Sequence, residues 1–396
     1  MFEKLEMAPP DAILGLAAAF NEDPNPDKIN LGVGVYMDAH GRTPGLACVQ
    51  AAEKRLLDAA PVEGYLPIDG APEYGALVQE LVFGAEHPII AEKCAATSHT
   101  PGGTGALRVA ADFVKTQFPG AKIWISDPTW ANHGNIFAAA GVETAEYPYY
   151  DASAHGLAFE AMAEALKKIP AGDVVLLHGC CHNPSGVDPT NEQWQRLSDI
   201  CTEAGWLPFF DLAYQGLGTG IEEDAAGVRT FAVPGRDMLV ASSFSKNFGL
   251  YCQRVGALTV VGAAAEAAKA AQSQIKKCIR ANYSNPPAHG GRLVVTVLTD
   301  PELRTIWQED VKGIRDRINA MRELFVETLK AKGVTQDFSF IKDQRGMFSF
   351  SGLTKDQVNL LQDNHSIYIV NSGRINVAGM TEGNMDRLCA ALAEVL

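Results

Sequence analysis

The sequence has fewer basic than acidic residues and no long apolar run. Both features reduce the range of partners that the protein is expected to bind. Its 33 Lys and Arg residues face 47 Asp and Glu residues, which gives a net charge of −14. This balance argues against nucleic acid or an anionic membrane as the main partner, although a buried pair of arginines can still bind a small anion. No apolar run approaches the ~20 residues of a membrane-spanning helix. We therefore expect neither a nucleic-acid nor a membrane partner.

Clustered cysteines, low-complexity linkers and internal repeats are also lacking. The eight cysteines stand singly except for Cys180 and Cys181, and direct neighbours rarely form a disulfide with each other. Residues 1–20 mix charges with short apolar stretches and do not show the pattern of a signal peptide. A reduced, cytoplasmic chain fits these features best.

What the chain does have is a globular composition and a regular alternation of two patterns. Its 396 residues, 47% of them hydrophobic, are enough for one large domain and a smaller one. Helical spacing at 159–169 and 194–201 alternates with short apolar runs, which predicts a mostly parallel sheet covered by helices on both faces. The apolar runs predict buried strands at 122–127, 173–179, 207–214, 238–245 and 255–262.

The pattern changes after Pro301. An apolar stripe from Trp307 to Leu329 predicts one long helix, with Gly333 as its C-terminal cap. Short strands and a terminal helix from about Glu382 follow. We predict an α/β fold with these parts: an N-terminal arm at 1–10, a small α+β domain at 11–43 and 314–396, and a large domain at 44–313.

The first candidate for chemistry is Lys246, which lies among small hydroxyl and aromatic residues in "VASSFSKNFGLYCQRVG". Ordinary surface lysines have charged neighbours, and here the nearest following charge is Arg254. Such a lysine suits imine chemistry, with the hydroxyls and the arginine binding an anion beside it. A Ser-rich turn after a strand explains the same stretch, so this motif does not decide alone.

Two further stretches carry the pattern of a binding site in an α/β protein. "TPGGTGALRVAADF", residues 100–113, is a glycine-rich turn that opens a helix, where backbone amides and the Thr104 hydroxyl would bind a phosphate. It matches neither the Walker nor the dinucleotide pattern, and a simple tight turn remains an alternative. Asp211 ends a predicted strand, at the edge where open α/β sheets bind ligands. The alternative for Asp211 is a helix N-cap.

The stretch "HGCCHNPSG", residues 178–186, looks at first like a metal site. Three ligands so close on an extended backbone do not converge tetrahedrally, and no second Cys/His group completes the set, so we expect no metal. Asn183 is better explained as an amide donor on a turn. Trp130 follows another strand, where it either packs in the core or stacks on a flat ligand ring.

Arg374 and Arg280 stand out because their neighbours in sequence are small or apolar. A guanidinium binds a carboxylate through two parallel hydrogen bonds. An internal ion pair is the alternative for each.

Taken together and in this order, the motifs resemble the aspartate aminotransferase family of fold-type-I pyridoxal phosphate enzymes, in the branch that includes aromatic aminotransferases. The resemblance implies a large domain with a mostly parallel central sheet flanked by helices, a smaller α+β domain, and a homodimer with shared active sites. It covers nearly the whole chain, through residues 11–20, 29–36, 100–113, 178–186, 210–216, 243–257, 283–290 and 372–380.

The resemblance implies a role for each residue around the cofactor ring. Lys246 would form the imine with pyridoxal 5'-phosphate and then move the proton between Cα and the cofactor. Asp211 would keep the ring nitrogen protonated, so that the ring draws electrons. Asn183 and Tyr214 would hydrogen-bond the ring oxygen, and Trp130 would stack on the ring.

It also implies which residues bind the phosphate and the substrate. His133 would support Trp130 at the ring. Arg374 would bind the α-carboxylate, the partner subunit's Arg280 the distal carboxylate, and Gly34, Trp130 and Asn183 would also contact the substrate. The phosphate would be bound by Gly102, Gly103, Thr104, Ser243, Ser245, Arg254 and Tyr65 of the partner subunit.

The implied reaction moves the amino group of L-aspartate to 2-oxoglutarate in a ping-pong cycle, giving oxaloacetate and L-glutamate. Met37 and Gly64 depart from the aspartate pattern, so an aromatic amino acid aminotransferase with overlapping dicarboxylate activity is an alternative. A pyridoxal-binding regulator and a decarboxylase or lyase on the same fold are further alternatives. The positions that match the aspartate type are Val35, Thr43, Thr104 and Asn285.

Overall fold

The protein is described by a computed structural model that covers residues 2–7, 14–61 and 63–396. The chain divides into two compact units. The small unit comprises Met1–Thr43 and Arg317–Leu396, and the large unit comprises Pro44–Asp316. The boundary at 316–317 lies inside the long helix α12 (Pro301–Ala331). The N-terminal arm and the domain limits derived from the sequence stay predictions, and residues 8–13 lie outside the described part.

The large unit is built on a seven-stranded sheet in the order β2-β10-β9-β8-β7-β3-β4. Strand β10 runs antiparallel to both of its neighbours, and the other pairs are parallel, which confirms the predicted mostly parallel sheet. The five predicted strands are all present, and β2 and β4 are additional. The bounds are β2 (Ala95–Pro101), β3 (Ile123–Asp127), β4 (Thr144–Pro148), β7 (Val174–His178), β8 (Leu207–Leu212), β9 (Met238–Ser243) and β10 (Val255–Val261).

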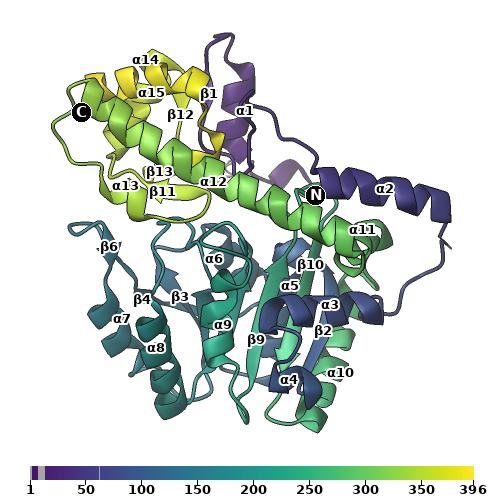
Figure 1. Cartoon of the computed structure of the whole chain (residues 1–396). Helices are drawn as coiled ribbons and strands as arrows, with labels where there is room; N and C mark the ends of the chain where they lie inside the picture. Colours follow the sequence, from purple (N-terminus) through teal and green to yellow (C-terminus); the bar gives the residue numbers. More distant parts are fainter. Residues whose placement is uncertain (1, 8–13, 62) are drawn as a thin grey trace. The chain divides into compact units, whose positions relative to one another are not determined.

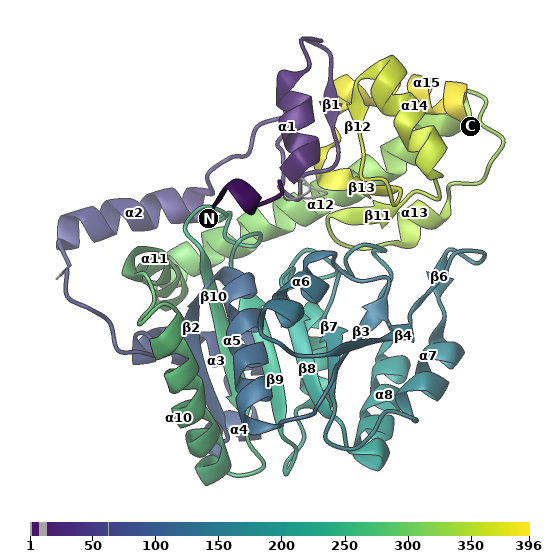
Figure 2. The ribbon, with the colours of Figure 1, turned by 180° about the vertical axis from the view of Figure 1, so that it is seen from behind.

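Helices cover both faces of this sheet, as the two opposite views of the ribbon show (Figures 1 and 2). Val174, Leu176 and Phe209 pack with α5, α6 and α10 on one face. Phe210, the next residue in β8, contacts aromatic rings of α8 and α9 on the other face. Successive side chains of a strand point to opposite faces, so strands buried on both faces must be apolar throughout.

The helices of the large unit include those predicted from periodicity at 159–169 and 194–201, which are α7 and α8. They are α2 (Ala47–Ala59), α3 (Pro72–Phe83), α4 (Pro88–Ala91), α5 (Gly102–Gln117), α6 (Asn132–Ala139), α7 (Phe159–Leu166), α8 (Asn191–Ala204), α9 (Ala226–Phe231), α10 (Ala265–Asn282) and α11 (Ala288–Thr299). The short strands β5 (Tyr150–Asp151) and β6 (Gly156–Leu157) form a separate hairpin.

The small unit combines short strand pairs with helices. Strand β1 (Ile29–Asn30) pairs in parallel with β12 (Ile367–Tyr368), and β11 (Phe348–Phe350) pairs antiparallel with β13 (Arg374–Asn376). The buried Arg322 of α12 donates hydrogen bonds to the carbonyls of Gly346 (2.7 Å) and Phe348 (3.0 Å), which fixes β11. The helices of this unit are α1 (Leu14–Glu22), α13 (Phe340–Asp343), α14 (Lys355–His365) and α15 (Glu382–Val395).

In the described part of the chain, none of the helices combines the length and the apolar character that a membrane crossing demands.

Candidate active site

The candidate site begins at the carboxyl edge of the large unit's parallel strands. His178 ends β7 and lies opposite Asp211 of β8 in the strand register. Asp211 is buried, with 8% of its surface exposed, although an isolated carboxylate avoids such an environment. The residues after β8 form turns rather than a helix, so the alternative interpretation of Asp211 as a helix N-cap is wrong.

A chain of hydrogen bonds stabilises the buried carboxylate. The Nε2 atom of His133, on α6, lies 3.1 Å from Oδ2 of Asp211. The other ring nitrogen of His133 lies 2.8 Å from the hydroxyl of Thr129, which is 3.1 Å from Nε2 of His178. Trp130 packs edge-on against His133, with ring centroids 5.3 Å apart. Residues from two separate stretches, 129–133 and His178, therefore support one carboxylate.

This environment keeps Asp211 ionised and His178 neutral. Burial alone would raise the pKa of Asp211, but the hydrogen bond from His133 and the charges of His133 and Lys246 hold that pKa below its usual value. Burial lowers the pKa of His178 to about 3, and the charge of His133 acts in the same direction. The site thus presents a fixed negative charge at the sheet edge, suited to a positively charged ring nitrogen.

Lys246 follows β9 by three residues and lies close enough to Asp211 for its charge to help lower the pKa of that carboxylate. Its Nζ atom is 4.8 Å from the ring centroid of Tyr214. The hydroxyl of Tyr214 accepts a hydrogen bond of 3.3 Å from the side-chain amide of Asn183. The next residue, Asn247, is fixed at its carbonyl by Trp307 (2.8 Å), which limits how far the Lys246 backbone moves.

A second group of residues forms an anion cradle at the start of α5. Gly102 has φ +75°, and a Cβ there would lie 2.5 Å from a guanidinium nitrogen of Arg254, so only glycine fits. The Ser243 hydroxyl is 3.2 Å from that of Ser245, which accepts a hydrogen bond of 3.4 Å from Arg254. No side chain caps α5, so its first N–H groups are available to a phosphate. Gly103 and Thr104 belong to this first turn.

In the small unit, Arg374 and Gly34 meet at one aromatic ring. The Arg374 guanidinium carbon lies 4.2 Å from the ring centroid of Phe348, and one of its nitrogens donates a 2.6 Å hydrogen bond to the carbonyl of Gly32. A Cβ at Gly34 would approach the Phe348 ring to 3.0 Å. Arg374 is 4% exposed, so this guanidinium has a fixed orientation before any carboxylate binds.

Tyr65 and Arg280, by contrast, lie at the surface of the large unit. Tyr65 is 95% exposed, on the segment before α3. Arg280 is exposed in the last turn of α10 and donates a hydrogen bond to the Ser284 hydroxyl. Within the described residues, neither side chain joins the hydrogen bonds around Lys246 and Asp211.

The chain is similar in sequence to known proteins. Residues 26–392 match the family model described as aminotransferase class I and II. The chain belongs to the class I and II aminotransferase family. It is 55% identical to the aspartate aminotransferase of Escherichia coli over 396 residues, with full coverage of both chains. It is 48% identical to an aromatic-amino-acid aminotransferase of Pseudomonas aeruginosa, covering 100% of this chain and 98% of the relative.

A solved structure of another member supports the fold. The aromatic-amino-acid aminotransferase of Burkholderia pseudomallei, crystallised covalently bound to pyridoxal phosphate, superposes with a TM-score of 0.97. It is 49% identical and covers 100% of this chain and 99% of its own. The fold-type-I architecture predicted from the sequence is therefore confirmed for this aminotransferase family member.

Sequence reasoning missed three residues that contact the candidate residues of their own unit. Thr129 bridges His133 and His178, and Phe348 packs under Arg374. His178 stands out in the sequence only as a possible metal ligand. A small polar residue near a tryptophan and a phenylalanine in a strand carry no signal by themselves, because their roles depend on contacts between distant parts of the chain.

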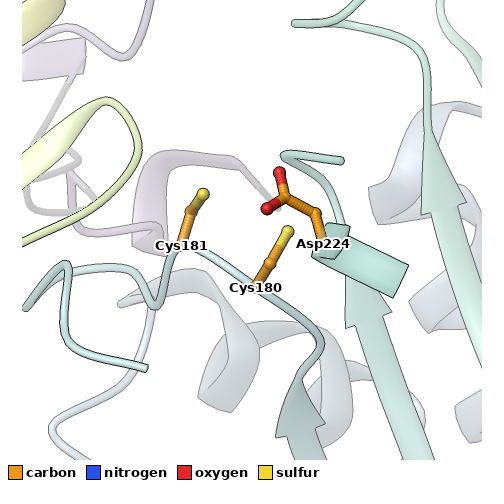
Figure 3. A group of neighbouring side chains, drawn as sticks. All are labelled: Cys180, Cys181 and Asp224. Atoms are coloured by element: carbon orange, nitrogen blue, oxygen red, sulfur yellow. The ribbon is translucent and has the colours of Figure 1, made fainter. Parts of the chain in front are cut away.

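A group of possible metal ligands lies beside the site of this family member, formed by Cys180, Cys181 and Asp224 (Figure 3). The Asp224 carboxylate already accepts backbone hydrogen bonds of 2.8 Å from Gly216, Gly218 and Thr219. The pKa of Cys180 is raised well above its usual value by its hydrogen bond with Cys181 and by burial. A protonated thiol and an occupied carboxylate are poor metal ligands. The absence of a metal stays a prediction.

Proposed function

We propose that this family member is a pyridoxal 5'-phosphate-dependent aspartate aminotransferase. It moves the amino group of L-aspartate to 2-oxoglutarate and releases oxaloacetate and L-glutamate. The observation that carries the proposal is the placement of Lys246 beside a buried, ionised Asp211 at the sheet edge, with an anion cradle in the same unit.

The residues present fit the cofactor. The glycine turn opening α5 leaves room that a Cβ at Gly102 would fill, and Arg254 and Ser245 line the same space with donors suited to a phosphate. Asp211 fits the protonated ring nitrogen, and Trp130 contacts His133, the residue that is hydrogen-bonded to Asp211. Bound pyridoxal phosphate supplies a protonated ring that delocalises the electron pair left when the α-proton is removed.

Each residue around the cofactor has a separate role in the proposed reaction. Lys246 would hold the cofactor through its Nζ atom, and its amine would take the α-proton of the substrate and return it. Asp211 keeps the ring nitrogen charged, because its own pKa is low and His133 fixes its orientation. Asn183 and Tyr214, which are hydrogen-bonded to each other, would bind the ring oxygen.

Substrate binding rests on the two arginines. Arg374 binds the α-carboxylate through a guanidinium already oriented by Phe348. The partner subunit's Arg280 binds the distal carboxylate in a homodimer, and Tyr65 of the partner subunit adds a hydroxyl to the phosphate cradle. Two-fold symmetry makes this exchange reciprocal. The exposure of Tyr65 and of Arg280 supports the proposal, since each is presented at the surface.

Aromatic amino acid transamination with overlapping dicarboxylate activity is the second candidate. Two observations favour it: the similarity to aromatic-amino-acid aminotransferases, and the open position of Gly64, where a Cβ would meet nothing within 4 Å. A small residue at that position would leave room for a larger side chain on the substrate.

The test is 2-oxo acid production from aspartate, tyrosine and phenylalanine, each with 2-oxoglutarate as acceptor. The proposal predicts the highest kcat/KM with aspartate. A higher value with tyrosine or phenylalanine would favour the second candidate. Product formed without any acceptor would indicate a decarboxylase or lyase, and the absence of turnover would indicate a regulator.

We also propose that the protein works in the cytoplasm. Its eight cysteines are free thiols in this fold, six of them buried, as suits a reducing compartment.

A further inference from the structure

We propose that the segment carrying Tyr65 and the helix carrying Arg280 form one rigid platform, held together by Asp69, so that a single latch positions both side chains for a second copy. The Asp69 latch is defined here as the Asp69 carboxylate with Lys276 and Gln272 of α10. The inference rests on the proposed function, because it concerns the two residues that the partner subunit receives.

The latch joins two stretches that are about 200 residues apart in sequence. The Nζ atom of Lys276 lies 2.7 Å from Oδ2 of Asp69, and the side-chain amide of Gln272 donates a 3.1 Å hydrogen bond to the same oxygen. The Asp69 side chain is 21% exposed and that of Lys276 38% exposed, so the pair is partly shielded from water. Gln272 and Lys276 are four residues apart and therefore lie on the same face of α10.

The backbone around Asp69 is fixed from the other side by β2. The N–H of His99 donates a 2.9 Å hydrogen bond to the Asp69 carbonyl. Gly70 follows with φ +88°, and a Cβ there would lie 2.5 Å from the His99 Cβ, so this close approach requires glycine. The C-terminal end of the Tyr65 segment is thus fastened at both the side chain and the main chain of one residue.

The residues after α10 complete the platform. The side-chain amide of Asn285 donates a 3.1 Å hydrogen bond to the carbonyl of Leu66, the residue that directly follows Tyr65. The hydroxyl of Tyr283 donates a 3.2 Å hydrogen bond to the carbonyl of His99. Arg280 itself donates to Ser284, which lies between those two residues. The anchors of Tyr65 and the base of Arg280 therefore share one turn.

Exposed side chains that act on another subunit depend on a rigid backbone for their position. Tyr65 is 95% exposed and gains no orientation from packing, so its position depends on the segment that carries it. A group that binds cofactor or substrate loses affinity when it must be ordered during binding, and pre-ordering removes that cost. Loosening Asp69 should therefore weaken the two functions in the twin site together, the retention of phosphate and the binding of a distal carboxylate.

The experiment compares Lys276→Met with Lys277→Met in the full-length holoenzyme. Both remove one positive charge from neighbouring positions of α10, but only Lys276 contacts Asp69, whereas Lys277 donates to Gln274. We expect Lys276→Met to raise both KM for aspartate and the dissociation constant of pyridoxal phosphate by about 2- to 5-fold, the effect of losing a partly exposed ion pair. The kcat at saturation should stay near wild type. Lys276→Arg, which retains the ion pair, should restore both constants.

Two further readouts separate positioning from a merely structural role. Amide hydrogen exchange should accelerate at residues 63–70 in Lys276→Met and stay unchanged in Lys277→Met. The double variant Asp69→Asn with Lys276→Met should be no worse than Asp69→Asn alone, because both substitutions break the ion pair between Asp69 and Lys276.

Several outcomes would overturn the proposal. One is faster exchange without any change in KM or cofactor affinity, and another is a change in only one of the two constants. Additive effects in the double variant, or equal effects of the two lysine variants, would also overturn it. If wild-type protein fails to transaminate aspartate, the proposed function fails. An active wild type with an indifferent Lys276→Met variant refutes the platform alone.

Discussion

The large unit holds its candidate catalytic residues in two opposite settings. At the sheet edge, Asp211 is 8% exposed and fixed by a chain of hydrogen bonds through His133 and Thr129. On the platform, Tyr65 is 95% exposed and Arg280 lies at the end of a surface helix. The first setting is complete within one chain. In the second setting, the backbone that carries the two side chains is held by hydrogen bonds, and the side chains themselves are exposed.

The difference separates the general part of the chemistry from its selective part. Every amino acid substrate has an α-proton, on which we propose that Lys246 and Asp211 act. Every such substrate also has an α-carboxylate, which we assign to the buried Arg374. Only a dicarboxylate has a distal carboxylate, which we assign to the exposed Arg280. Under the proposed function, residues that serve every substrate belong to the same chain as Lys246, and the residue that selects among substrates would come from a second copy.

The largest expected effect comes from the residues at the sheet edge. Lys246→Ala should lower transamination of aspartate and of phenylalanine alike by several orders of magnitude, because it removes both the covalent attachment and the proton carrier. The cofactor should still bind through its phosphate, but the visible absorbance of the covalent form should disappear. Steady-state kinetics with both substrates check this, and near-normal rates would refute the assignment of Lys246.

The next largest effect should be selective. Arg280→Ala should lower kcat/KM for aspartate by roughly 30- to several-thousand-fold, the cost of leaving a buried carboxylate without its charged partner. Phenylalanine has no distal carboxylate, so its kcat/KM should change little. The matched variant Arg374→Ala should impair both substrates. Equal losses for aspartate and phenylalanine in Arg280→Ala would contradict the assigned division.

His133 tests the support of the buried carboxylate. His133→Leu removes a hydrogen bond to a charged group, generally worth about 1.5–3 kcal/mol, and should raise the pKa of Asp211. Asp211 in the native fold has a lowered pKa, so its stabilising contribution is present above the unfolded value of 3.8 and is lost as the pH falls through the folded value. As the pH falls, the His133→Leu variant should lose the stabilising contribution of ionised Asp211 at a higher pH than the wild-type protein does.

The measurement for His133 is a pair of pH profiles. Both the acid limb of kcat/KM and the acid limb of unfolding free energy should move to higher pH in His133→Leu. His133→Asn, which keeps an amide donor, should show a smaller displacement. An acid limb that is identical in all three proteins would mean that His133 does not set the ionisation of Asp211.

The smallest effect should come from Phe348. Phe348→Leu removes a cation–π contact with Arg374 that is worth about 0.5–2 kcal/mol, so KM should rise a few-fold for all amino acids. The control is Phe325→Leu, a buried substitution in the same unit on α12 that should lower stability without changing KM. A rise in KM for aspartate alone would place Phe348 with the selective residues instead.

The sequence predicted the apolar strands and the residues with unusual neighbours, and it missed elements whose stability depends on pairing. Strand β2 reads "AATSHTP" and has no apolar alternation, yet it pairs along its length with β10. Its buried Thr97 is satisfied by the hydroxyl of Thr259 at 2.8 Å. Polar residues that find partners on another strand are buried without any hydrophobic signal, so periodicity cannot detect them.

The same limit applies to the candidate site. Lys246, Asp211 and Arg374 attracted attention because a charged residue sat among apolar or small neighbours. Thr129 and Asp69 did not, because each acts by contacting a residue far away in the sequence. Local pattern identifies groups that carry chemistry. It does not identify the groups that hold them in place.

The central claim, that one subunit's Lys246 works with the other subunit's Arg280, has a direct test. The inactive Lys246→Ala variant and the dicarboxylate-deficient Arg280→Ala variant are mixed under conditions that allow subunit exchange, and aspartate turnover is measured. A mixed dimer contains one site with an intact Lys246 from one chain and an intact Arg280 from the other, so activity on aspartate should reappear. Continued inactivity, with exchange demonstrated independently, would contradict the shared site.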